Sequence, residues 1–130
     1  LTVTGDISAS VNISASAFYG YGSNLTNLSV STFTRTEVTS STYTVLTSDY
    51  YVGVNFTGSG VSTLTLPDAS TMNSGQTIII KDESGQAATY NIVINADTGQ
   101  DIDGQASQTI ESNYGAISLY SNGVDKYFIF

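Results

Sequence analysis

The stretch LTVTGDISASVNISASA, residues 1–17, alternates apolar and polar side chains almost without interruption. Every odd position is apolar except Gly5, and every even position carries Thr, Ser, Asn or Asp. A period of two is typical of a β-strand with one face toward water and one face away from it. Seventeen residues at roughly 3.3 Å each would span about 56 Å, which is far longer than the usual strand of a globular domain.

A strand of this length finds no partner for its apolar side within a chain of 130 residues. If three copies lie around a common axis, each apolar stripe meets two others, and the small Ala residues let the chains approach closely. We therefore predict a homotrimeric, β-rich shaft. Its seam consists of Leu1, Val3, Ile7, Ala9, Val11, Ile13, Ala15, Ala17, Leu25 and Leu28. The alternative is a strand of a larger sheet whose other strands lie outside this sequence.

The overall composition favours an all-β chain that binds neither nucleic acid nor a membrane. Thr and Ser account for 37 of the 130 residues, and nine Tyr dominate the aromatic residues. Residues of these types suit a pleated, half-buried surface. The net charge of −8, with only three Lys and Arg, argues against a phosphate-binding surface. No apolar stretch approaches the length of about eighteen residues that a membrane-spanning helix needs.

Three regions differ in composition: a shaft at residues 1–30, a polar neck at 31–42 (STFTRTEVTSST) and a head at 43–130. Apolar runs between turn residues predict strands in the head near 43–46, 50–56, 61–66, 76–82, 90–94, 108–111, 116–120 and 126–130. Asp68 is expected to cap a helical turn within 68–75. This spacing predicts a β-sandwich head of jelly-roll-like type, with a barrel as the competing architecture.

The residue inventory leaves little room for catalysis. Without His or Cys, neither a Ser–His–Asp nor a Cys–His arrangement can be assembled, and no thiolate metal site is available. The densest group of acids lies in NADTGQDIDG, with Asp97, Asp101 and Asp103. Asp beside Gly and Asn usually stabilises turns, so these three residues are only weak candidates for calcium. We predict no catalytic residue, no metal site and no cofactor.

Aromatic side chains are the candidates for recognition, because Tyr combines a flat apolar face with a polar tip. Tyr114 lies in the loop SNYG and is expected to be exposed, whereas Tyr50 and Tyr120 lie at or near strands. We predict these three as receptor contacts; the alternative is that most tyrosines fill the core or the seam between chains. In the final strand, Phe128 and Phe130 are expected on one face, with Tyr127 and Ile129 on the other.

The stretch GDISASVNISASAFYGYGSNLTNL resembles the shaft modules of bacteriophage tail fibres and related virion fibres. Those modules run from a G-[DN]-I-x-A alternation into a turn of the type F-x-G-D-G-S-x-L-T-x-L. Tyr21 stands where that turn usually has Asp, so no metal role is transferred to it. The head is similar to terminal domains of such fibres in LTLPDAS, GQTIIIKDESGQA, YNIVINADTGQDIDGQ and IESNYGAISLYSNGVDKYFIF.

The resemblance implies a homotrimer on a virion surface, as a tail or capsid fibre outside the cell, with other virion proteins upstream and a terminal knob that contacts a host glycan or protein. We therefore predict a non-enzymatic fibre tip that attaches by several weak sites at once. The rivals are a purely structural fibre or capsid decoration without a receptor, a bacterial surface adhesin or pilus-like subunit, and a polysaccharide depolymerase.

Overall fold

Short alternating runs of apolar residues, separated by Gly, Asn and Asp, fold into ten strands in residues 33–130, the part of the chain that the computed structural model describes. The strands are β1 (Arg35–Val38), β2 (Thr42–Thr44), β3 (Tyr51–Val54), β4 (Ser62–Thr65), β5 (Thr77–Asp82), β6 (Ile92–Asn95), β7 (Asp101–Ile102), β8 (Ser107–Ile110), β9 (Ala116–Ser121) and β10 (Lys126–Ile129). One turn of 3-10 helix, Ala69–Thr71, lies between β4 and β5. These described residues hold no helix of the length and apolarity that crossing a membrane requires.

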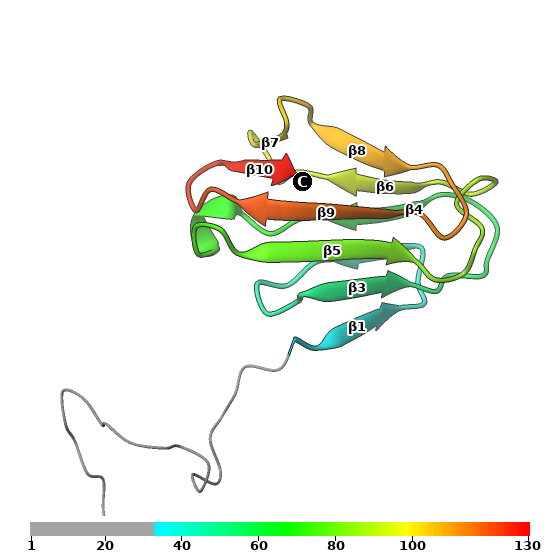
Figure 1. Cartoon of the computed structure of the whole chain (residues 1–130). Coiled ribbons are helices and arrows are strands. Elements are labelled where there is room, and N and C mark those ends of the chain that lie inside the picture. The colour runs from blue at the N-terminus through cyan, green and yellow to red at the C-terminus, as the bar shows by residue number, and fades with distance from the viewer. Residues whose placement is uncertain (1–32) are drawn as a thin grey trace, which may run out of the picture. The chain divides into compact units, whose positions relative to one another are not determined.

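Successive strands alternate between two mixed sheets, so that the chain winds back and forth between them (Figure 1). Sheet A has six strands in the order β1-β3-β5-β9-β10-β7, and sheet B has four in the order β2-β4-β6-β8. Within sheet A, β1, β3 and β5 run parallel, as do β2, β4 and β6 within sheet B. Parallel neighbours cannot be joined by a tight turn, and here each connection passes through a strand of the other sheet.

The winding ends in antiparallel strands. β8 pairs antiparallel with β6, while β9 pairs antiparallel with both β5 and β10. The hairpin between β9 and β10 turns through residues 122–125. β7 forms the far edge of sheet A and is only two residues long. So short an edge offers little free backbone to which a foreign strand could pair.

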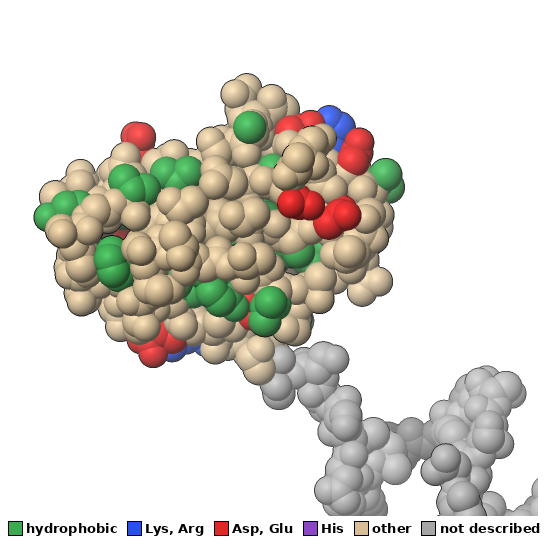
Figure 2. Space-filling model, turned by 180° about the vertical axis from the view of Figure 1, so that it is seen from behind, with side chains coloured by type: hydrophobic (Ala, Val, Ile, Leu, Met, Phe, Trp, Pro, Cys, Tyr) green, Lys and Arg blue, Asp and Glu red, His purple; other side chains and the backbone are tan. Residues whose placement is uncertain are grey.

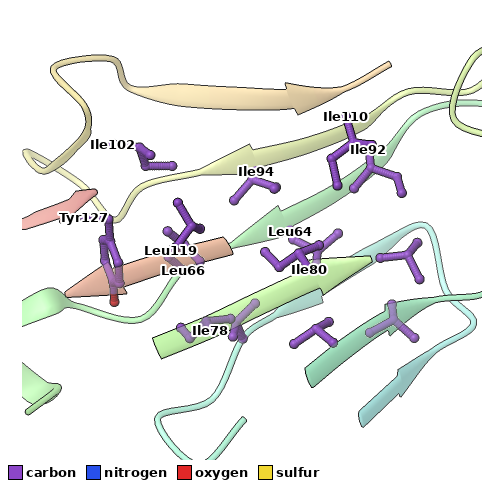
Figure 3. Close-up of a cluster of buried hydrophobic side chains, with 14 of the residues drawn as sticks. Leu64, Leu66, Ile78, Ile80, Ile92, Ile94, Ile102, Ile110, Leu119 and Tyr127 are labelled. Carbon is purple, nitrogen blue, oxygen red and sulfur yellow. The ribbon is translucent and has the colours of Figure 1, made fainter. Parts of the chain in front are cut away.

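A continuous hydrophobic core lies between the two sheets (Figure 3). Its buried residues are Val38, Val45, Val52, Val54, Leu64, Leu66, Ala69, Met72, Ile78, Ile80, Ala87, Ile92, Ile94, Ile102, Ile110, Leu119 and Tyr127. Alternation brings every second side chain inward, as with Ile78 and Ile80 of β5. Tyr127 is fully buried, and its hydroxyl donates to the Pro67 carbonyl at 2.8 Å, so its polar tip is satisfied.

The all-β class expected from the composition is confirmed, and the eight expected strands of the head correspond to β2–β6 and β8–β10. Asp68 caps the helical turn as predicted, by accepting a hydrogen bond from the Ser70 N–H. The neck assigned to residues 31–42 differs from the structure, because residues 35–38 form β1 and bury Val38 against the core. The predicted shaft, with its seam from Leu1 to Leu28, lies outside the described residues.

Two buried carboxylates connect the strands where the loops leave the sheets. Asp82, at the end of β5, accepts hydrogen bonds from the Ser84 hydroxyl and from the N–H groups of Gly85, Ala87 and Tyr114, at 2.8 to 3.1 Å. Burial alone would raise the pKa of Asp82, but these four donors outweigh it and hold the pKa below its usual value. The carboxylate therefore stays ionised in the core.

Asp49, in the connection between β2 and β3, is the second buried carboxylate and plays a similar role. It accepts hydrogen bonds from the Thr36 hydroxyl at 2.6 Å, from the Tyr43 hydroxyl at 2.8 Å and from the Leu46 N–H at 2.8 Å. These contacts join β1 of sheet A to β2 of sheet B. Burial and the bond to Asp49 raise the pKa of Tyr43 to about 12, so the phenol remains a donor at neutral pH.

Replacing Asp82 by Asn tests the first of these carboxylates. The amide nitrogen of Asn would face two backbone N–H donors, and we expect a loss of roughly 2–4 kcal/mol in the free energy of unfolding at pH 7. Because the folded-state pKa of Asp82 is lowered, its contribution is present above the unfolded pKa of about 3.9 and is lost as the pH falls through the folded value. Urea unfolding at several pH values should show the two proteins converging in acid. Glu111→Gln, at an exposed carboxylate, is the control; a similar loss there would contradict the assignment.

Candidate binding surface

The outer face of sheet A contains a groove of about 360 Å³ across β1, β3 and β5. Parallel register sets Arg35 opposite Tyr51 and Tyr51 opposite Ile79, so the three form one row across the sheet. The groove is lined by Arg35, Tyr51, Gly53, Ile79, Lys81 and Glu83. Its lining combines an aromatic ring, an aliphatic side chain and charged groups. This combination suits a ligand with an apolar face and polar edges.

The carboxylate of Glu83 is held over Gly53, on the surface of the sheet. A Cβ atom at Gly53 would overlap the carboxyl group of Glu83, so only glycine leaves this space free. The Nε of Arg35 donates to Glu83 at 2.9 and 3.1 Å, and one of its terminal nitrogens also contacts this carboxylate. A guanidinium that contacts both carboxylate oxygens fixes the carboxylate in orientation as well as in position.

The charges of the groove balance one another. Arg35 also lies 3.4 Å from Glu37, whose other partner is the Asn55 amide at 2.8 Å. The hydrogen bond from Arg35 lowers the pKa of Glu83, and the bonds from Asn55 and Arg35 lower that of Glu37. Both acids are therefore ionised at neutral pH. Arg35, Lys81 and Glu83 line the groove and Glu37 lies beside it, so these two basic and two acidic residues together have no net charge.

Tyr114 lies in the loop between β8 and β9 and is 65% exposed, as its loop position predicts. Its backbone is left-handed, with φ of 59°, and its N–H is bound by Asp82. The ring lies over Gly85, where a Cβ would overlap it. Lys81, which lines the groove, donates to the Tyr114 carbonyl and lies 5.5 Å from the ring centroid. Tyr114 therefore lies beside the groove, held by the same lysine.

The other two predicted tyrosines also belong to sheet A or its connections. Tyr120 is 36% exposed on β9, and its ring packs against Phe128 and Phe130 with centroid distances of 5.3 and 5.9 Å. Tyr50 is half-buried just before β3, and its ring lies 4.6 Å from that of Tyr51. Their role as receptor contacts stays a prediction.

The final strand has the expected alternation. Tyr127 faces the core, whereas Phe130 is 69% exposed and Phe128 packs on the same outer side. Ile129, although on the side of Tyr127, is 39% exposed, because β7 pairs only with Lys126 and Tyr127 and leaves the end of β10 uncovered.

The groove residues Arg35, Tyr51, Lys81 and Glu83 are absent from the candidates found in the sequence. Twenty-eight residues separate Tyr51 from Ile79, and only the parallel register brings their strands together. No short sequence motif indicates which distant strands pair, or in which register. The adjacent charges Lys81, Asp82 and Glu83 are the one local signal, and alternation there separates the buried Asp82 from the exposed rim.

The carboxylates of Asp97, Asp101 and Asp103 do not converge on one point in the structure. Asp101 forms an ion pair with Lys126 at 2.6 Å and accepts from the Gly104 N–H, and the bond from Lys126 lowers its pKa. Asp103 reaches the Ile129 N–H at 3.4 Å, while Asp97 accepts from the Gln100 N–H through its backbone carbonyl. Within residues 33–130, no three Asp or Glu side chains converge as a metal site requires.

Calcium should therefore leave the head unchanged. Because Lys126 already neutralises Asp101, we expect the same midpoint of thermal unfolding in millimolar calcium as in excess chelator. Differential scanning fluorimetry measures this directly, with magnesium as the control cation. A rise that is specific to calcium and is lost in Asp101→Asn would contradict this reading of the turn.

Comparison with known proteins does not assign the chain to a family. No family model matches the chain, and no curated protein matches it.

Proposed function

We propose that this chain is the tip of a homotrimeric fibre on a virion, in tail or capsid position, and that it binds the host surface without catalysing a reaction. Residues 1–30 form the shaft, and the two sheets pack as a sandwich-like head. The resemblance of the shaft and head motifs to virion fibres supports this proposal. The structural observation that carries it is the groove on sheet A, where Tyr51 and the paired Arg35 and Glu83 form a ready-made binding surface.

The groove is best suited to an uncharged sugar of a host glycan. The ring of Tyr51 and the side chain of Ile79 offer apolar contact to the carbon face of a pyranose. In the described part of the chain, Oε1 of Glu83 has Arg35 Nε as its one donor, which leaves this oxygen a lone pair to accept from a sugar hydroxyl. Because Glu37, beside the groove, balances the charges that line it, the surface offers no strong electrostatic preference for an acidic sugar. Three such sites on one stalk would convert weak single contacts into firm attachment.

The trimer is tested by multi-angle light scattering of the full chain. We expect about three times the mass of 13.7 kDa for one chain, because each apolar stripe of the shaft is covered only by other copies. Dilution across the micromolar range should leave this mass unchanged. A single-chain mass at these concentrations would remove the fibre proposal and favour a monomeric adhesin module.

The groove is tested by binding of the full chain to host cells. Tyr51→Ala should lower the apparent affinity by roughly tenfold, since a truncated aromatic anchor typically costs a kcal/mol or more. Gly53→Ala should have a similar effect, because it displaces the carboxylate of Glu83. Val124→Ala is the control, because Val124 is 65% exposed and lies in the β9–β10 turn rather than in the groove.

Two further outcomes separate the rival functions. Periodate treatment of the cells should abolish binding if the ligand is a glycan, whereas protease treatment should not. Equal binding of the Tyr51→Ala and control variants would contradict the groove as the site. Release of reducing sugar from host polysaccharide would contradict a purely binding role.

A further inference from the structure

The outer face of sheet B carries two rows of short, uncharged side chains. Parallel and antiparallel register place Thr42, Thr63, Val93 and Thr109 in one row across the four strands. The second row consists of Thr44, Thr65, Asn95 and Ser107. Six of these eight residues are Thr or Ser. All eight are exposed or half-buried, while their neighbours Leu64, Ile92 and Ile94 face the core.

Sheet B contains no charged residue in any of its strands, TYT, STLT, IVIN and SQTI. The whole chain has eleven acidic and three basic residues, so this absence distinguishes the face from the rest of the surface. Seen from the side opposite to Figure 1, the middle of the molecule shows backbone and uncharged side chains, some of them hydrophobic, while acidic and basic side chains lie toward its ends (Figure 2). Sheet A, by contrast, presents Arg35, Glu37 and Lys81 on its outer face.

We infer that the outer face of sheet B is the surface through which the heads of neighbouring copies contact one another. This inference rests on the trimer proposed above. Copies that each carry a net charge of −8 repel one another. The approach that costs least electrostatic and desolvation energy brings together faces without charge. A face directed at a three-fold axis meets both neighbouring copies at once.

The chemistry of the rows fits contact with identical rows. A Thr hydroxyl both donates and accepts, so two such rows can form hydrogen bonds at more than one relative shift. The methyl group supplies apolar contact, and a β-branched side chain loses little rotamer freedom on burial. At the β2 end of the face, a hollow of about 370 Å³ lined by Thr42, Tyr43, Thr44, Thr63 and Thr65 leaves space for a side chain of the neighbour.

The size of the face determines how the contact forms. Four strands about 4.8 Å apart, β2 with three residues and the others with four, give at most roughly 19 by 13 Å, or about 250 Å². Stable interfaces bury about 800 Å² per partner. The face is too small to hold free heads together, and it forms a contact only because the shaft tethers the heads at high local concentration. Loss of the head contact and loss of the trimer are therefore separate events.

Cross-linking of the full chain tests this contact, and the chain is convenient because it contains no Cys. Thr63→Cys places a thiol in the middle of the sheet B face, and Thr77→Cys places one on the outer face of sheet A. Both residues are half-buried Thr on strands, which makes them matched positions. A bismaleimide about 10 Å long corresponds to the spacing of packed sheets. Thr65→Cys repeats the test in the second row.

We expect Thr63→Cys and Thr65→Cys to give about tenfold more covalent dimer on a denaturing gel than Thr77→Cys, given the high local concentration of tethered heads. Labelling by a monofunctional maleimide shows that the thiols react equally, and light scattering reports the trimer in the same samples. A trimer in which Thr77→Cys cross-links better, or in which none of the variants cross-links, would overturn the contact and leave the fibre intact. A single-chain mass would overturn both.

Discussion

Parallel register between strands that are distant in the sequence is the constraint on which the rest of this structure depends. Side chains alternate along a strand, so a shift of one residue would turn every inward group outward. The pairing of Tyr51 with Ile79 keeps Val52 and Ile80 in the core while it directs the two partners to the surface. The same rule in sheet B buries Leu64 against Ile94 and leaves Thr63 and Val93 outside. Core and surface are thus two results of one alignment.

The charged side chains also differ between the core and the surface. The buried carboxylates Asp49 and Asp82 each bind several donors from different strands and loops, so they lock the connections that parallel pairing makes necessary. The exposed carboxylate of Glu37 and the half-buried carboxylate of Glu83 bind Arg35 at the edge of sheet A. An edge strand that carries paired charges is poorly suited to recruit further strands. Sheet B lacks charge altogether, which separates the two outer faces by chemistry.

Local sequence signals predict the strands and their inward faces well, and they also predict the cap at Asp68 and the exposure of Tyr114. They fail where the signal is not local. Residues 35–38 look like a neck because Val38 is their only aliphatic residue, yet pairing with β3 suffices to make them a strand. Two residues, as in β7, are too few to show a period. The groove escapes the sequence because Arg35, Tyr51 and Glu83 meet only through pairing across the sheet, and mixed pairing cannot be distinguished from hairpins by alternation.

The connections of the winding differ in length, yet the strands that they join stay in register. Sixteen residues separate Arg35 from its partner Tyr51, and twenty-eight separate Tyr51 from Ile79, yet each of these three residues occupies the same level of the sheet. The additional residues form loops at the ends of the strands, and the chain enters the next strand in the same register. Such an architecture lets natural variation lengthen or exchange a loop at the rim without disturbing either face.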